Sequence, residues 1–394
     1  MNIHELRNDT EGCNSVIHFN NAGAALMPKP VAKAIRDYIT EEENYGGYEV
    51  ADRKINELNS FYNHAAKLLN TKPGNIAFTT NATDSYNRAL SSIPFKANEV
   101  VLLSKNDYPS NFIACLSLQK RFGIKIELVE NTATGEIDLE DLEKKIKQFL
   151  PKLISVTHVP TSSGIVQPVN EIGNIIKNYD AVFLLDACQS IGQMPVNAAA
   201  THADFISGTF RKFLRGPRGA GLLYVSDKAL QSGYEPLLPD IRGADWIAEN
   251  RYKEVNNAKR FEDWETAYAL MTGSTAALQY ALNLGIEAVE ARNTMLNDKL
   301  RNDLRTYCNI ETLDRGKKQC SIITFKAGNL SMEATKEFFR DKGINIYATS
   351  KTSAQIDFEE KNVDWVLRVS PHYYNTAEEI DIFIDAVKTL QSLH

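Results

Sequence analysis

The sequence contains few cysteines, no cysteine pair and no long apolar run. Its five cysteines are odd in number and widely scattered, without a CxxC motif, which argues against structural disulfides and against a zinc site. No window approaches the roughly eighteen apolar residues of a membrane-spanning helix, and MNIHELRNDTEGCN lacks the basic start and apolar stretch of a secretion signal. We therefore expect a cytoplasmic protein without a membrane-spanning helix or a bound metal.

Positive charge is also scarce. The 394 residues include 44 Lys or Arg and 50 Asp or Glu, which gives a formal net charge of -6. Nucleic acids and anionic membranes bind clustered positive charge over a broad face, so we expect neither as a partner. Hydrophobic residues form 43% of the chain, which allows a sizeable core, and the length favours two domains.

Short apolar runs alternate with longer amphipathic segments between about residues 76 and 226. Several runs are apolar on both faces, as strands must be in a sheet that helices cover on each side. The alternation predicts repeated βαβ units and an α/β fold. The predicted strands are residues 76–79, 100–103, 124–129, 153–158, 181–186, 204–208 and 221–225.

The pattern changes after residue 225. A long helical pattern covers residues 262–305, with breaks near Gly273 and around Gly285. Beyond it, the segments 321–325, 331–342 and 365–370 and a last helix from Ala377 predict a smaller α/β unit. We expect a large domain over residues 17–284 and a small domain formed by residues 1–16 and 285–394.

Polar clusters directly follow four of the predicted strands. Open α/β sheets bind ligands outside the carboxyl ends of their strands, so these clusters should converge at one rim. The clusters are residues 80–83 (TNAT), 158–164 (HVPTSSG), 186–189 (DACQ) and 209–212 (TFRK). The first of them begins a helix with Asn81 or Thr83 as N-cap. Its free N–H groups suit a phosphate, although capping alone explains the same residues.

Two ionisable residues at this rim have unusual neighbours. Asp186 ends an apolar run, so its carboxylate needs a partner, either a protonated ring nitrogen or the amides of the next loop. Lys212 lies among Arg211, Arg215 and Arg218. Neighbouring cations lower the pKa of an ammonium group and make a nucleophilic amine available. A solvated basic turn is the alternative interpretation of the segment SGTFRKFLRGPRG.

The order of these features resembles a known group of enzymes. Helix-start threonines come first, then an aspartate that closes an apolar strand, then Thr209-x-Arg211-Lys212. This arrangement resembles the fold-type-I pyridoxal-phosphate enzymes, and specifically the class V aminotransferase group of cysteine desulfurases, selenocysteine lyases and isopenicillin N epimerases. The resemblance implies bound pyridoxal 5′-phosphate, a large domain with a mostly parallel seven-stranded sheet, a smaller C-terminal domain and a homodimer with active sites near its interface.

The resemblance also implies roles for single residues. Lys212 would form a Schiff base with the cofactor, Asp186 would keep the pyridine nitrogen protonated, and Tyr108 would stack on the ring. The other implied cofactor contacts are Gln189 at the ring hydroxyl, Thr161 beside the ring, and Ala82, Thr83, Thr209 and Arg211 at the phosphate. The implied substrate contacts are His158, the turn of Asn21, Ala22 and Gly23, and Arg368, whose planar guanidinium suits an α-carboxylate.

The sequence departs from the pattern of that group in four places. Arg211 stands where relatives often have histidine, and Thr161 stands where desulfurases usually have asparagine. Desulfurases pass sulfur to a cysteine on a loop before the carboxylate-binding arginine, but residues 347–365 contain none. We expect Cys188 and Cys320 in the core, which disfavours a persulfide-forming desulfurase. Where relatives offer a Gly-Thr pair to the phosphate of the neighbouring subunit, this chain has Trp264 and Glu265. Arg215 and Arg218 would replace that contact, bind a second acidic group of the substrate, or only keep the loop soluble.

We interpret the chain as a pyridoxal-phosphate-dependent C–S lyase. It would act by β-elimination on a cysteine conjugate, a cysteine sulfoxide or selenocysteine. Transamination and epimerisation require the same cofactor and lysine, so both stay open as alternatives. A non-catalytic module that binds an anion or RNA through its basic loop is a further alternative, and the joint presence of Lys212 and Asp186 argues against it.

Overall fold

A seven-stranded sheet forms the centre of the computed structural model, which describes residues 1–393. The strand order is β2-β8-β7-β6-β5-β3-β4. Strands β3 to β7 pair in parallel, whereas β8 is antiparallel to both β2 and β7. The prediction of a mostly parallel seven-stranded sheet is therefore confirmed. The strands are β2 (Ile76–Thr79), β3 (Val100–Ser104), β4 (Lys125–Val129), β5 (Leu153–Thr157), β6 (Val182–Asp186), β7 (Phe205–Thr209) and β8 (Gly221–Val225).

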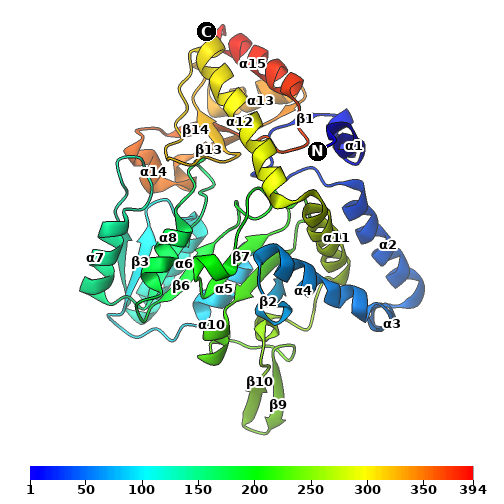
Figure 1. Cartoon of the computed structure of the whole chain (residues 1–394), viewed down its shortest axis with the longest axis vertical. Coiled ribbons are helices and arrows are strands. Elements are labelled where there is room, and N and C mark those ends of the chain that lie inside the picture. Colours follow the sequence, from blue (N-terminus) through cyan, green and yellow to red (C-terminus); the bar gives the residue numbers. More distant parts are fainter. Residues whose placement is uncertain (394) are drawn as a thin grey trace.

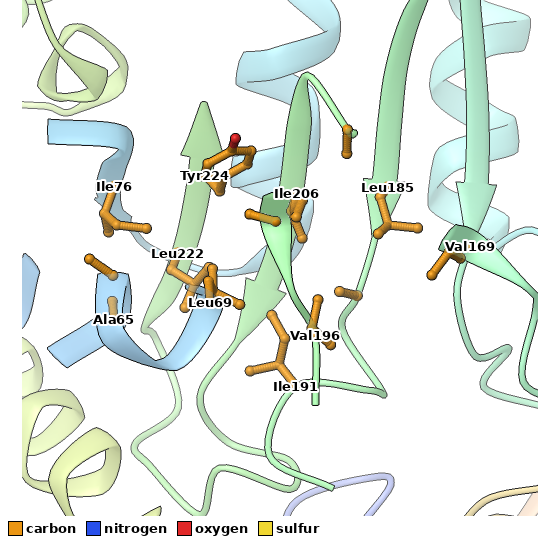
Figure 2. Close-up of a cluster of buried hydrophobic side chains, with 14 of the residues drawn as sticks. Ala65, Leu69, Ile76, Val169, Leu185, Ile191, Val196, Ile206, Leu222 and Tyr224 are labelled. Carbon is orange, nitrogen blue, oxygen red and sulfur yellow. The ribbon is translucent and has the colours of Figure 1, made fainter. Parts of the chain in front are cut away.

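Successive residues of the central strands enter different hydrophobic clusters. In β6, Phe183 and Leu185 belong to one cluster, while Val182 and Leu184 belong to another. Adjacent strand side chains point to opposite faces, so the sheet separates two layers of core. Figure 2 shows part of the first cluster, in which Leu222 of β8 lies near Leu69 of helix α4 (Ile55–Leu69). Each fully buried Leu or Phe contributes about 1.5–3 kcal/mol to stability.

Helices cover both faces of this sheet (Figure 1). The first part of the chain forms α1, whose Leu6 packs against Val289 and Tyr374 instead of the sheet, followed by α2, α3 and α4. Of the later helices, α5 to α10 each follow a strand. These helices are α1 (Ile3–Asn8), α2 (Lys29–Tyr45), α3 (Gly47–Arg53), α5 (Ala82–Ser91), α6 (Pro109–Phe122), α7 (Leu139–Phe149), α8 (Val169–Ile176), α9 (Ala198–Thr201), α10 (Asp227–Gln231) and α11 (Tyr268–Leu284).

The last part of the chain builds a smaller unit around its own core. Leu300, Phe325 and Phe383 belong to a hydrophobic cluster that does not include the central sheet. This cluster agrees with the expected small domain, whose boundary near Gly285 stays a prediction. Its elements are α12 (Ile286–Cys308), α13 (Met332–Asp341), α14 (Gln355–Glu360), α15 (Ala377–Gln391) and the antiparallel strands β11 (Ile323–Phe325), β14 (Trp365–Val369) and β13 (Tyr347–Ser350), with β1 (Ile17–His18) paired to β12 (Ile344–Asn345).

Two features differ from the sequence prediction. Gly273 does not break the helix, because α11 continues through it; a Cβ there would lie 2.4 Å from a side-chain carbon of Ile35 in α2. Glycine at this position therefore serves the close approach of two helices. The hairpin of β9 (Ala244–Ala248) and β10 (Arg251–Glu254) was not predicted, and it extends from the end of the molecule opposite α15 (Figure 1). No helix within residues 1–393 combines the length and apolarity needed to cross a membrane.

Candidate active site

A cavity of about 340 Å³ lies at the carboxyl ends of the parallel strands. All the residues that we predicted as cofactor contacts line it, which supports the expectation that the polar clusters meet at one rim. They are Ala82, Thr83, Tyr108, Thr161, Asp186, Gln189, Thr209, Arg211 and Lys212. Thr157, Cys188 and Arg218 line the same cavity.

Asp186 ends β6 with a side chain that is 5% exposed. Its Oδ1 accepts a hydrogen bond from the Cys188 N–H at 2.9 Å, and its Oδ2 accepts one from Asn111 Nδ2 at 3.0 Å. Burial raises the pKa of Asp186, while these two donors and the Lys212 ammonium act in the opposite direction. A cation at the cavity end of this carboxylate would lower its pKa further and stabilise the buried charge.

Asp107 is a second buried carboxylate that the sequence analysis missed. Asn111 donates to Asp107 Oδ1 at 2.9 Å with the same Nδ2 that contacts Asp186, and Thr157 donates its hydroxyl proton to Asp107. Burial raises the pKa of Asp107 to about 6, against the lowering effect of Thr157 and Asn111. Asp107 follows β3 closely, so the rule that selected the other strand ends would have selected it as well.

Lys212 is buried, and its Nζ donates a hydrogen bond to Cys188 Sγ at 3.2 Å. Desolvation is the main cause that lowers the pKa of Lys212, and the charge of Arg211 adds to it. We expected the neighbouring arginines to be the cause, and only Arg211 among them contributes. The position of Cys188 also differs from the prediction, because this residue is half-buried and lines the cavity instead of lying in the core.

Arg368, in β14, adjoins the wall of the cavity at Thr161, although it is not itself among the lining residues. Its Nη1 donates to the carbonyl and the hydroxyl of Thr161 at 2.9 and 2.8 Å, and its Nη2 donates to Asn20 Oδ1 at 3.2 Å. Within the described residues its buried Nε has no partner. Desolvation lowers the pKa of Arg368 to about 10. A carboxylate bound here would both satisfy Nε and stabilise the buried cation.

The turn of Asn21, Ala22 and Gly23 lies against the same wall. Gln189 Nε2 donates to the Ala22 carbonyl at 3.2 Å and to Thr161 Oγ1 at 3.1 Å. The Arg211 guanidinium contacts the Gly23 carbonyl. Asn21 is fully buried, and its side-chain amide donates to the Ser370 carbonyl at 2.7 Å. The turn is therefore held beside the cavity, although none of its residues lines the cavity itself.

Comparison with known proteins places this geometry in a family. The family model of aminotransferase class-V matches residues 17–383. The chain belongs to the class V aminotransferase family. A probable cysteine desulfurase from Pyrococcus abyssi is 26% identical over 401 residues, with 98% of each chain covered.

Solved structures of class V enzymes have the same fold as this chain. A cysteine desulfurase from Thermococcus onnurineus NA1 is 27% identical, with a TM-score of 0.90 and coverage of 98% of this chain and 97% of the other. A cystine C–S lyase solved with its product cysteine persulfide is 21% identical, with a TM-score of 0.86 and coverage of 97% and 99%. The class V chain is therefore a pyridoxal-phosphate-dependent enzyme and not a non-catalytic module.

The cavity of this class V enzyme fits pyridoxal 5′-phosphate. It offers a buried amine from Lys212 and a buried carboxylate from Asp186. It also contains Gln189 Oε1, which is buried without a partner among residues 1–393 and suits a ring hydroxyl. Asn81 caps α5 by accepting from the Asp84 N–H at 2.9 Å, which leaves the first N–H groups of the helix for a phosphate.

Arg215 does not reach the cavity of the class V enzyme. Its side chain is 1% exposed and donates to the Leu26 carbonyl, the Tyr373 hydroxyl and Thr10 Oγ1 at 2.8, 2.7 and 2.6 Å. The expectation that Arg215 contacts the phosphate or the substrate was therefore wrong. Arg218 is exposed and lines the cavity.

His158 is also placed differently from the prediction. His158 is among the residues that line a separate cavity, while its neighbours Thr157 and Val159 line the cofactor cavity. The His158 backbone N–H donates to the Asp186 carbonyl at 2.9 Å, so the chain still follows β6 at this point. Because side chains alternate along extended backbone, consecutive residues face different sides. The expected contact of His158 with the substrate therefore stays a prediction, which its absence from the lining of the cofactor cavity does not support.

Proposed function

We propose that this class V enzyme cleaves the Cβ–S bond of a cysteine derivative by β-elimination. The observation that carries the proposal is the segment 347–365, which leads to Arg368 and contains no cysteine that could accept sulfur. The desulfurase and C–S lyase relatives support sulfur amino acids as the substrate class. In the net reaction a cysteine conjugate and water give a thiol, pyruvate and ammonia.

Three residues of the chain perform the proposed reaction. Arg368 binds the substrate α-carboxylate and thereby positions Cα near Lys212. Lys212 removes the Cα proton, and its lowered pKa makes the neutral amine available as a base. Asp186 keeps the ring nitrogen of the cofactor protonated. When bound, pyridoxal 5′-phosphate supplies an electron sink for the negative charge that develops at Cα.

Cys188 supports a second candidate function, a desulfurase that uses this thiol as sulfur acceptor. Its Sγ lies 3.2 Å from Lys212 Nζ inside the cavity. The reaction would convert cysteine and the Cys188 thiol into alanine and a Cys188 persulfide. Burial raises the pKa of Cys188, which reduces the thiolate fraction available for attack. We therefore prefer the lyase.

The products distinguish these reactions. Holoenzyme incubated with S-ethylcysteine should release pyruvate, ammonia and ethanethiol without an added keto acid. Lys212→Ala should release none, and Cys188→Ala should keep most of the activity. Alanine formation from cysteine with a mass increase of one sulfur atom on Cys188 would establish the desulfurase instead. A strict need for a keto acid would indicate transamination, and inversion at Cα without fragmentation would indicate epimerisation.

We also propose that Arg218 binds the phosphate of the cofactor. It lines the cavity together with Ala82 and Thr83, the first residues of α5, whose positive end favours an anion. Arg215 lies elsewhere, which leaves Arg218 as the cation of this loop that is able to replace the Gly-Thr contact of relatives.

We further propose a homodimer. The segment from Leu237 to Trp264, which includes the β9–β10 hairpin, exposes several large apolar side chains. Clustered exposed apolar residues of this kind mark a protein–protein interface. The exposed side chains are Leu237, Leu238, Ile241, Trp246, Ile247, Tyr252 and Trp264. Light scattering should give twice the mass of one chain for the wild type and a lower mass for Trp246→Asp.

A further inference from the structure

A second cavity, separate from the cofactor cavity, has a volume of about 890 Å³. Pockets that hold small molecules have volumes of about 300–1,000 Å³. Its walls come from the first turns of α7 and α8, from the residues before α9, and from Lys317 and Lys318 in the segment between α12 and β11. The large unit and the C-terminal part of the chain therefore both contribute to it.

One part of the lining of this cavity is apolar, although most of the lining residues are polar or charged. Met194 and Val196 precede α9, and both are buried. Such a surface favours the apolar body of a ligand. The buried apolar residues that line the cavity are Ile137, Val166, Val169, Met194 and Val196.

Two buried polar side chains of the lining have atoms without a partner among the described residues. Gln167 is 1% exposed, and its Oε1 accepts from the Ile137 N–H at 2.8 Å. This bond fixes the orientation of the amide, so the unpartnered atom is the donor Nε2. His158 Nδ1 is likewise buried and unpartnered. Burial lowers the pKa of His158 to about 3, so the imidazole is neutral.

A buried donor without an acceptor costs about 1–3 kcal/mol. Native proteins contain few such atoms, and two in the lining of one cavity require an explanation. An acceptor group of a bound molecule would remove the cost at Gln167 and, with the imidazole proton on Nδ1, at His158.

The charges at the rim indicate which acceptor fits. Lys317 is exposed at the rim, whereas Lys318 forms an ion pair with Glu290 at 2.7 Å. The N-cap of α8 is Pro168, which provides no side-chain acceptor. The Val169 N–H donates to the Gln167 carbonyl at 2.9 Å, so the N–H groups of Asn170 and Glu171 are the first-turn donors left for a ligand.

Four carboxylates also line this cavity. Asp138 caps α7, and Glu136 binds Thr132, Thr134 and the Lys317 N–H, so both are occupied. Glu140 and Glu171 remain at the rim. Their charges disfavour a multiply charged anion such as phosphate, whereas a single carboxylate needs fewer positive groups.

We propose that this cavity binds a small monocarboxylate with an apolar body. The carboxylate would lie at Gln167, the first turn of α8 and Lys317. The apolar body would lie against Met194 and Val196. This site does not depend on the reaction proposed above.

Calorimetric titration of the holoenzyme with phenylacetate tests the proposal. Wild-type enzyme should bind it. Asn170→Trp should abolish binding, because Asn170 is an exposed lining residue and an indole there would fill the mouth. Lys317→Ala should weaken binding about threefold to tenfold through the loss of one charge contact. Lys326→Ala, which removes an exposed lysine outside the lining, is the matched control and should bind like the wild type.

Arg368→Ala separates this site from the active site, since the active site also suits carboxylates. Binding should persist in Arg368→Ala. The proposal is overturned if phenylacetate does not bind the wild type, or if binding survives Asn170→Trp and Lys317→Ala but disappears in Arg368→Ala. Inorganic phosphate that binds as tightly as phenylacetate would also overturn the assigned ligand class. An unchanged cofactor absorption band shows that each variant is folded. If Asn170→Trp does not fold, the binding of phenylacetate to Lys317→Ala alone tests the proposal.

Discussion

The two cavities on either side of the chain after β5 differ in how their polar groups are satisfied. In the cofactor cavity, Asp186 and Asp107 share the amide of Asn111, and Lys212 contacts Cys188. Both linings include a residue with a buried polar atom that has no partner in the part of the chain that the structure describes, Gln189 in the cofactor cavity and Gln167 in the second, but the cofactor cavity adds buried charged groups that hydrogen-bond to neighbouring side chains. Preorganised groups suit chemistry, because they cost no rearrangement during the reaction. Unpartnered groups on an apolar surface suit binding.

Substitution of Asp186 should have the largest effect in this comparison. Asp186→Asn removes the negative charge at the ring nitrogen and should lower kcat about 100- to 1,000-fold, because the electron sink weakens. Steady-state kinetics of holoenzyme checks this. The cofactor absorption band should remain, since Lys212 is intact. A loss smaller than about threefold would mean that Asp186 does not face the ring nitrogen.

Substitutions of Arg218 and Arg215 should change different properties, cofactor affinity for Arg218 and folding stability for Arg215. Arg218→Ala should raise the dissociation constant of pyridoxal 5′-phosphate about tenfold and leave thermal unfolding nearly unchanged. Arg215→Ala should lower the unfolding free energy by about 3 kcal/mol, because it leaves buried groups of Thr10, Leu26 and Tyr373 unpaired. Absorbance titration and denaturant unfolding measure the two effects. If the effects were exchanged, the assignment of the two side chains would be reversed.

The raised pKa of Asp107 should appear in the pH dependence of stability. In the folded apoprotein its pKa is about 6, above the ordinary value of 3.8. The folded state therefore binds the proton more tightly, and the resulting stability is present below pH 3.8 and is lost as pH rises to about 6. Asp107→Asn should consequently gain stability relative to wild type between pH 4 and pH 7. Melting temperatures across this range check it, and parallel curves for the two proteins would contradict it.

The sequence predicts the sheet well because buried strands require continuous apolar runs, and each of the seven runs forms a strand. The rim residues follow from the rule for strand ends, as Asp186 and Lys212 show. That rule does not give the direction of a side chain. Arg215 and Arg218 lie three residues apart in one basic loop, yet positive φ at Arg215 and the pocket of tyrosines around it turn only Arg215 inward. Such contacts depend on segments distant in sequence.

Substitution of His158 should have the smallest effect on activity, and it tests directly whether the two cavities are separate. His158 lines the second cavity, and its backbone N–H donates to the Asp186 carbonyl. His158→Gln should therefore leave kcat/KM within about threefold and keep the cofactor absorption band, because the backbone bond to Asp186 is retained. Kinetics and absorbance spectra of the purified holoenzyme measure both. A 100-fold loss with a shifted band would instead place this imidazole at the cofactor, and the separation of the two cavities would fail.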